Sequence, residues 1–305
     1  MPSWKLFSPD SSKGFSLVEL LVAMTIGSVM CAMAVGGILA NRKLYQHDLA
    51  RTRLTQNLRS SMEYLGVNIR EAGENLPLSV PAVELINGIN GASDELIVRR
   101  SMIDEVLKLC QPIAAGSGVS RVYFAHIGEE AGCTFDTNLQ NYSAWRDYRI
   151  EQGGTVSVYI YDPYSQLGEF FKITGEDQQI SSLALIRNGG AFVNSYSVGQ
   201  SALFLMEEWH FRVGDDWEGD PVFQIIENDD VANPKNVTHG LTSFQVRIFK
   251  TDGTVVEEFS RTDQWVDIAS IEVTISGREI VSDAQHTEIA STYSARFFPR
   301  NILSH

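Results

Sequence analysis

Apolar residues in the first quarter of the chain follow two successive patterns. Residues 15–40 read FSLVELLVAMTIGSVMCAMAVGGILA, an apolar run whose only charge is Glu19. After this run the chain becomes polar, but apolar residues recur at steps of three and four positions: Leu54, Leu58, Met62, Leu65, Ile69 and Ala72. Such spacing places their side chains on one face of a helix.

The two patterns predict one continuous helix. No proline occurs between Phe15 and Leu76, and Gly73 followed by Pro77 supplies a stop signal. We therefore expect a helix from about Phe15 to about Gly73, roughly 90 Å long. Its first half is long enough to cross a membrane. Its second half carries one apolar stripe, which should pack on a folded domain.

From Leu78 onward, short apolar runs rich in β-branched and aromatic residues predict strands. The expected strands are 96–100, 121–125, 155–161, 170–173, 183–187, 202–206, 208–213, 221–226, 241–249 and 268–276. The strands 241–249 and 268–276 alternate apolar and polar residues, as half-buried antiparallel strands do. Residues 251–254 (Thr-Asp-Gly-Thr) predict a turn. The fold class is therefore α+β, with the long helix packed on an antiparallel sheet domain that spans 77–305.

Composition narrows the classes of partner. The net charge of −14 argues against nucleic-acid binding, which requires basic surfaces. Of the three cysteines, Cys31 lies in the apolar run, and Cys110 and Cys133 lie in the strand-rich part. These two fit one disulfide if that part is exported, and two buried thiols otherwise.

Glu19 stands out within the apolar run. A carboxylate inside a membrane helix costs about 2.5 kcal/mol or more, so such residues are usually functional and paired. A position near the helix start, within reach of lipid headgroups, is the simpler alternative. A secretory signal peptide would have a shorter apolar stretch and a small-x-small cleavage site, which this run lacks.

Residues 13–22 read KGFSLVELLV. This segment resembles the class III signal of type IV prepilins and pseudopilins, in which a polar leader ends in glycine and an aromatic residue and a glutamate follow. The resemblance implies that a prepilin peptidase removes residues 1–14 by cutting between Gly14 and Phe15, and methylates the new amino terminus. The mature chain would then comprise a helix over 15–76, transmembrane over about 15–40, and the domain 77–305.

The same resemblance implies a role for Glu19. The new amino terminus at Phe15 is a cation, and charge pairs are strong where the dielectric constant is low. Glu19 lies four residues away and can pair with it in one helix or between neighbouring subunits. Docking would relieve the cost of the unpaired carboxylate, and thus favour assembly.

The C-terminal segment adds a looser resemblance. Residues 240–248 (GLTSFQVRI), Trp265, residues 268–275 (IASIEVTI) and the ending 297–301 (FFPRN) resemble the PilW minor-pilin family. They resemble the J pseudopilin of type II secretion more distantly. Pro299 before the Arg-Asn pair departs from the family ending, and residues 77–240 carry no such match.

Motifs of catalysis and metal binding do not occur in the sequence. The six histidines are scattered, and HExxH, GxSxG, GxGxxG and P-loop motifs are missing. We therefore expect no enzyme, catalytic residue, cofactor or metal. The acidic loops 215–220 and 227–230 have side chains that calcium accepts but lack EF-hand spacing, so solvated loops are expected. Trp209, Phe211, Trp217 and Phe223 are expected in the core rather than in a binding groove.

The resemblance implies a minor pilin that primes or caps a type IV pilus. Its partners would be other minor and major pilins, the prepilin peptidase, the inner-membrane assembly platform and the membrane itself. Its location would be the bacterial inner membrane, single-pass, with the globular domain in the periplasm, until incorporation into the pilus. The alternatives are a minor pseudopilin of a type II secretion or competence system and, from another class, a membrane-anchored binding module or hydrolase.

Overall fold

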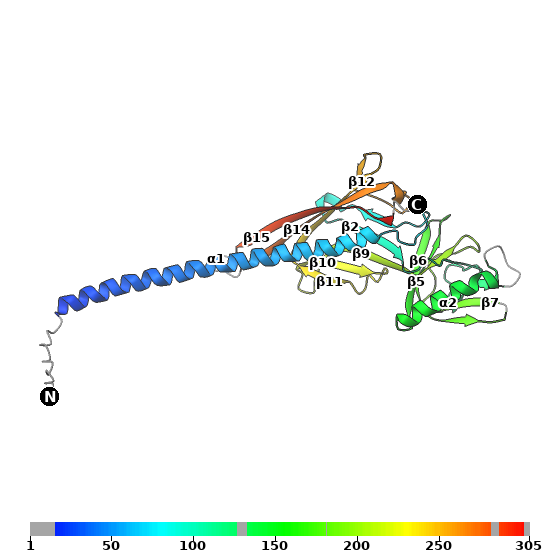
Figure 1. Ribbon diagram of the computed structural model, residues 1–305, viewed down its shortest axis with the longest axis horizontal. Coiled ribbons are helices and arrows are strands. Elements are labelled where there is room, and N and C mark those ends of the chain that lie inside the picture. The colour runs from blue at the N-terminus through cyan, green and yellow to red at the C-terminus, as the bar shows by residue number, and fades with distance from the viewer. Residues whose placement is uncertain (1–15, 127–132, 181, 282–286, 302–305) are drawn as a thin grey trace, which may run out of the picture. The chain divides into compact units, whose positions relative to one another are not determined.

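One long helix opens the chain, and strands make up most of the remaining residues (Figure 1). The structure is a computed structural model that describes residues 16–126, 133–180, 182–281 and 287–301. The helix α1 spans Leu17–Glu71, close to the predicted range. The chain leaves α1 at Gly73, whose φ of 81° is in the left-handed region that glycine adopts readily. The ring of Trp265 lies where a side chain at this position would point.

The C-terminal half of α1 buries the predicted stripe. Leu54, Leu58, Met62, Leu65, Ile69 and Ala72 are all at most 3% exposed. Each large apolar side chain contributes about 1.5–3 kcal/mol on burial. Tyr64 adds edge-to-face contacts to Trp209 and Phe211, with ring centroids 5.9 and 6.2 Å apart. This half of the helix is therefore part of the folded domain, as the spacing predicts.

Two antiparallel sheets contact this part of α1. The first has the order β1 (Val83–Ile86), β2 (Glu95–Ser101), β9 (Met206–Asp215), β10 (Pro221–Glu227) and β11 (Lys235–His239). The second has the order β13 (Val255–Val256), β12 (Leu241–Lys250), β14 (Ile268–Ile280) and β15 (Glu288–Phe297). Short 3₁₀ turns, Ile89–Gly91 and Trp265–Asp267, precede β2 and β14. Buried Asp94 joins the two sheets, because its Oδ2 accepts the Val246 N–H at 2.7 Å.

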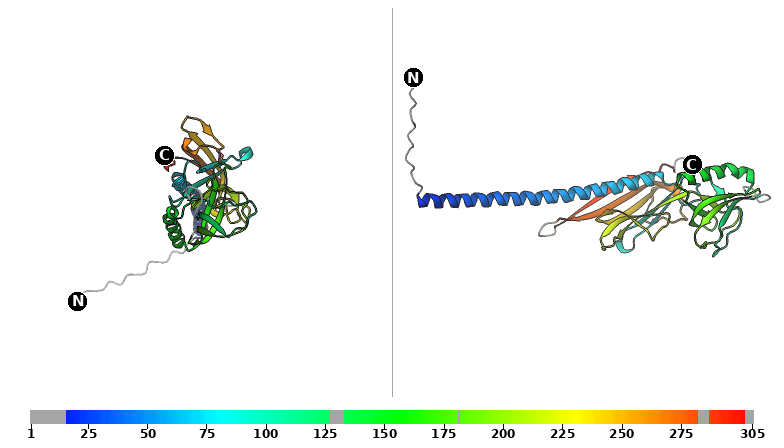
Figure 2. Two further views of the ribbon diagram at one scale, coloured as in Figure 1. Left: turned by 90° about the vertical axis from the view of Figure 1, so that its right-hand side faces the viewer. Right: turned by 90° about the horizontal axis from the view of Figure 1, so that it is seen from below.

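A third sheet is formed by the chain between β2 and β9. Its order is β3 (Leu107–Lys108), β8 (Ala202–Phe204), β5 (Val156–Asp162), β6 (Leu167–Gln178), β7 (Ser182–Asn188) and β4 (Arg121–His126). A second helix, α2 (Phe135–Glu151), lies against this sheet, as the green segments in Figure 2 show. Trp145 of α2 is fully buried there, and its Nε1–H donates to the Glu105 carbonyl oxygen at 2.8 Å.

The predicted α+β class with an antiparallel sheet domain is confirmed. The two alternating segments pair as β12 and β14, with Val246 opposite Val273. One local prediction was wrong: residues 202–206 belong to two strands, because the chain passes from the third sheet to the first at Leu205. Helix α2 and the strands β1, β3, β11, β13 and β15 were not foreseen.

Candidate assembly surface

The N-terminal half of α1 exposes its apolar side chains. Between Leu17 and Leu39 the large apolar residues are 50–78% exposed. In the described part of the chain, α1 is the one helix that is long and apolar enough to cross a membrane. An apolar surface of this extent favours contact with lipid or with the helices of other proteins. The helix fits a membrane anchor.

The hydroxyl groups of Thr25 and Ser28 donate to main-chain carbonyl oxygens of the same helix. Thr25 Oγ1 donates to the Val22 carbonyl oxygen at 2.8 Å, and Ser28 Oγ donates to the Thr25 carbonyl oxygen at 2.8 Å. Gly27, Gly36 and Gly37 have open space where a Cβ atom would stand. The segment therefore offers another helix a smooth apolar surface with room for close approach.

Glu19 lies in the first turn of α1. A negative side chain is favourable there because it faces the positive end of the helix dipole. Within the residues that the structure describes, Glu19 forms no ion pair. Gly14 and Phe15, the expected processing positions, lie outside the described residues, as does the leader 1–14. The pairing of Glu19 with the amino group of Phe15 stays a prediction.

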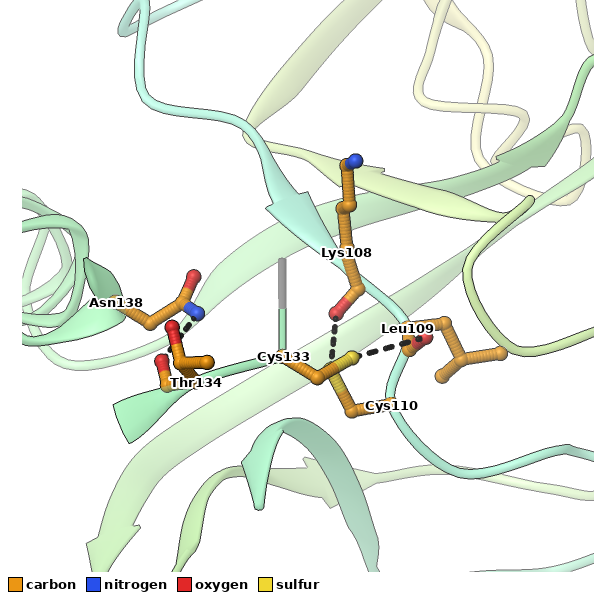
Figure 3. The surroundings of a disulfide bond; sticks show 6 residues. All are labelled: Lys108, Leu109, Cys110, Cys133, Thr134 and Asn138. Atoms are coloured by element: carbon orange, nitrogen blue, oxygen red, sulfur yellow. Dashed lines mark hydrogen bonds between the residues drawn. A yellow bond between two sulfur atoms is a disulfide. The ribbon is translucent and has the colours of Figure 1, made fainter. Parts of the chain in front are cut away.

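Cys110 and Cys133 are joined by a disulfide, with their Cα atoms 5.6 Å apart (Figure 3). The bond ties the segment after β3 to Cys133, which lies two positions before the first residue of α2. Both cysteines are at most 1% exposed, and Cys31 is a free, exposed thiol in the apolar segment. Because the bond closes a loop within the third sheet, it restrains this part of the fold.

A charge network around Arg99 accounts for several acidic residues of the domain. The fully buried Arg99 guanidinium donates to Glu208 Oε2 at 2.5 Å and to Glu84 Oε2 at 2.9 Å. Arg261 donates to the same Glu84 oxygen at 2.9 Å. Burial alone would raise the pKa of Glu84, but the two guanidinium groups outweigh it and hold that pKa below its ordinary value. The residues are partners of one another, as a structural network requires.

The acidic loop 215–220 is an ordered turn. The carboxylates of Asp216, Glu218 and Asp220 lie within 4.8 Å of one another. Asp216 Oδ1 accepts the backbone N–H groups of Glu218 at 2.8 Å and Asp220 at 3.0 Å. These bonds account for the order of the turn without an ion. His239 Nδ1 lies 3.3 Å from Asp216 Oδ2.

One aromatic expectation was wrong. Phe211 and Phe223 are fully buried, and Trp209 contacts Tyr64. Trp217, in contrast, is 88% exposed at the turn between β9 and β10. Its neighbours Asp215, Asp216, Glu218 and Asp220 could have signalled an exposed loop, since a core position seldom lies among four carboxylates.

A comparison with known families finds a match to the N-terminal segment. Residues 10–35 match the family described as "Prokaryotic N-terminal methylation motif". Neither a search of curated proteins nor a search of solved structures found a match to the chain. The match supports a type IV pilin-like protein, a component of pilin or pseudopilin assemblies that a prepilin peptidase processes. It points to a structural role rather than to an enzyme.

Proposed function

We propose that the protein is a minor pilin that primes or caps a type IV pilus. The observation that carries this proposal is the exposed apolar half of α1 with Glu19 in its first turn, in a segment that matches the N-terminal methylation motif. Residues 1–14 are a leader, and the prepilin peptidase cuts between Gly14 and Phe15. The helix 15–76 anchors the chain in the inner membrane through about 15–40, and the domain 77–305 lies in the periplasm.

The proposed assembly step depends on whether the Glu19 carboxylate is paired with a positive charge. In the membrane the carboxylate carries a cost of about 2.5 kcal/mol or more. A neighbouring subunit supplies the methylated amino group of its own first residue, and the pair is strong in a medium of low dielectric constant. The charge pair sets the axial register of the helix bundle, and the apolar surfaces of the helices supply the packing.

The looser C-terminal resemblance supports a PilW-like place in a pilus. The inner-membrane assembly platform would extract the subunit, and other minor and major pilins would be its neighbours. The disulfide fits a periplasmic domain, because such bonds persist in oxidising compartments. The alternative, a minor pseudopilin of a secretion or competence system, has the same anchor. Pull-down of the full chain after crosslinking in its own cells, with mass spectrometry of the partners, separates a pilus from a secretion machine.

Replacement of Glu19 tests the central step. We expect Glu19→Ala to be cleaved normally but to lose about tenfold or more of its incorporation into assembled filaments, in line with a lost buried charge pair. Asp48→Ala is the matched control, since Asp48 is an exposed carboxylate of the same helix beyond the apolar run. Normal incorporation of Glu19→Ala would refute the proposed role.

Mass spectrometry of the mature chain tests the processing. We expect a methylated Phe15 at the amino terminus and a mass lower by two hydrogen atoms than that of the chain with Cys110 and Cys133 reduced. An intact Met1 in cells with an active prepilin peptidase would contradict the proposal independently of the Glu19 result.

A further inference from the structure

Trp217 projects from the folded domain on a hydrogen-bonded turn. Besides the two bonds to the Asp216 carboxylate, the Asp216 N–H donates to the Asp220 carbonyl oxygen at 2.9 Å, and the Gly219 N–H donates to the Asp216 carbonyl oxygen at 3.1 Å. These backbone N–H groups, that of Asp220 foremost, hold the pKa of Asp216 below its ordinary value. The turn therefore presents an exposed indole among carboxylates on a hydrogen-bonded backbone, and little backbone freedom would be lost when it binds a partner.

The domain also contains a groove of complementary character. It lies between α1 and β15, has a volume of about 690 Å³, and is lined by Met62, Val67, Tyr293 and Phe297 among others. Gly66 forms part of its wall, where a Cβ atom would stand 2.5 Å from the Phe297 ring. Val67 is 49% exposed and Tyr293 is 39% exposed, so apolar and aromatic surface is open to an occupant.

The rim of the groove is basic. Arg59 and Arg70 line it, both exposed, and neither forms an ion pair with a carboxylate in the part of the chain that the structure describes. Arg70 stands 5.4 Å from the centroid of the Phe297 ring. The third arginine of the lining, Arg296, is paired with Glu272 at 2.9 Å, and Glu63 is the one carboxylate among the lining residues.

We propose that the turn Asp215–Asp220 of one copy docks into this groove of a second copy, with the Trp217 indole inserted between α1 and β15. The indole is flat and apolar, and the guanidinium groups of Arg59 and Arg70 attract its face. The exposed carboxylates of Asp215, Glu218 and Asp220 come to lie opposite these arginines. The occupant is a second copy because both complementary surfaces occur on this chain.

The placement of the two surfaces makes the contact head-to-tail. Ser61 of α1 bonds to Thr238 of β11 at 2.8 Å, next to β10 and its turn, and Gly66 touches Phe297 of β15. Five residues separate these positions, so they face directions about 140° apart on the helix. Figure 1 shows β10 and β11 on one side of α1 and β15 on the other. Between copies whose helices are parallel and offset along their axes, a contact between different faces repeats in one direction instead of closing into a two-fold dimer.

The contact also fixes an axial offset. The turn lies beside Pro221, whose carbonyl oxygen accepts the Gly240 N–H at 3.0 Å. Gly240 in turn bonds to Arg278, next to Gly277, which contacts Leu54 and Leu58. The groove lies along Arg59 to Arg70. Two copies with parallel helices would therefore be offset by about 13 Å along α1.

Disulfide crosslinking of the full chain in membranes tests the proposal. In a Cys31→Ser background, membranes that contain Asp215→Cys and Val67→Cys on separate copies, with Trp217 kept on both, are oxidised with copper phenanthroline. We expect a crosslinked dimer from this mixture and a ladder of higher species when both cysteines are on one chain. Tyr164→Cys replaces Asp215→Cys in the control, because Tyr164 is 88% exposed on another hairpin turn. Equal crosslinking of Tyr164→Cys and Asp215→Cys to Val67→Cys would overturn the proposal.

The charge part is tested by reversal in the same crosslinking mixture. Arg70→Glu on the groove copy should lower the crosslinked fraction about tenfold, the size expected for an anchor contact. Glu218→Arg on the turn copy should restore it. Failure of this rescue, or a crosslink of Asp215→Cys in whole cells to a chain of a different mass, would show that the occupant is not a second copy. These outcomes are independent of Glu19 and of leader cleavage, since the contact does not rest on the proposed role in priming.

Discussion

The two halves of α1 differ in where their apolar side chains find contacts. In the N-terminal half, Leu21 is 54% exposed, and the polar Ser28 bonds within its own helix. In the C-terminal half, Leu65 is fully buried, and Ser61 bonds to another element, β11. The side chains of one continuous helix thus have two different environments. One half is complete within the domain, and the other needs lipid or another subunit.

Truncation of a leucine should give the largest contrast between the halves. Leu65→Ala leaves a cavity under α1, and we expect the free energy of unfolding of the domain to fall by about 2–5 kcal/mol. Leu21→Ala, the matched change in the exposed half, should leave it unchanged. Denaturant unfolding of the full chain in detergent micelles, followed by tryptophan fluorescence, measures both. Equal effects would contradict the assignment of the two environments.

Removal of a hydroxyl should give a smaller contrast. Ser61→Ala leaves the buried Thr238 hydroxyl without its partner at 2.8 Å, which should cost about 1–3 kcal/mol. Ser28→Ala removes an exposed bond within the helix and should not change the same unfolding transition. The double variant Ser61→Ala with Thr238→Val should recover part of the loss, because no unpaired polar group remains. A double variant no more stable than Ser61→Ala would contradict this explanation.

A methyl group added at a glycine should give a loss of about 1 kcal/mol. At Gly66 it meets the Phe297 ring, and the packing cost exceeds the helix-forming gain of alanine. At Gly36 nothing lies within 4 Å, so Gly36→Ala should not lower the stability of the domain. Thermal unfolding measures both. A Gly66→Ala protein that unfolds at a higher temperature than the natural one would show that Phe297 moves aside freely.

Lowering the pH should have the smallest effect on the stability of the domain, and this effect acts through the Glu84 carboxylate. The folded pKa of Glu84 lies below its ordinary value of 4.5, so its contribution to stability is present above about pH 4.5 and is lost as the pH falls further. Glu84→Gln should therefore flatten the acid limb of the stability curve, measured by unfolding at a series of pH values. An unchanged acid limb in this variant would show that Glu84 makes no such contribution.

The sequence predicted the elements whose burial follows a simple period. The stripe of α1 is periodic over its whole length, and β12 and β14 alternate cleanly. Helix α2 was missed because its buried side chains, chiefly Tyr142 and Trp145, form a narrow stripe in a segment rich in asparagine, aspartate and arginine. Contacts with β4, β6 and β7 of the third sheet stabilise it, and the spacing of residues within the helix carries no record of those contacts.

The two candidate surfaces, the helix segment around Glu19 and the groove, also differ in whether the sequence could predict them. Glu19 was recognisable because one charge in an apolar run is conspicuous in the sequence. The groove was not, since it joins α1 to β15, two segments more than two hundred positions apart. The break between β8 and β9 likewise depends on which sheet each strand enters, and residues 202–206 alone have one continuous strand pattern.

The chain enters and leaves the region of the third sheet at one place, where β2 ends and β9 begins. Ser101, the last residue of β2, is paired with Met206, the first residue of β9. Residues 102–205 therefore form an insertion whose two ends lie side by side. It connects β2 to β9 as a hairpin loop connects two paired strands. Such a segment can lengthen, shrink or be exchanged during evolution while β2 and β9 keep their register. Related subunits can thus share the helix and its two sheets and still carry different heads.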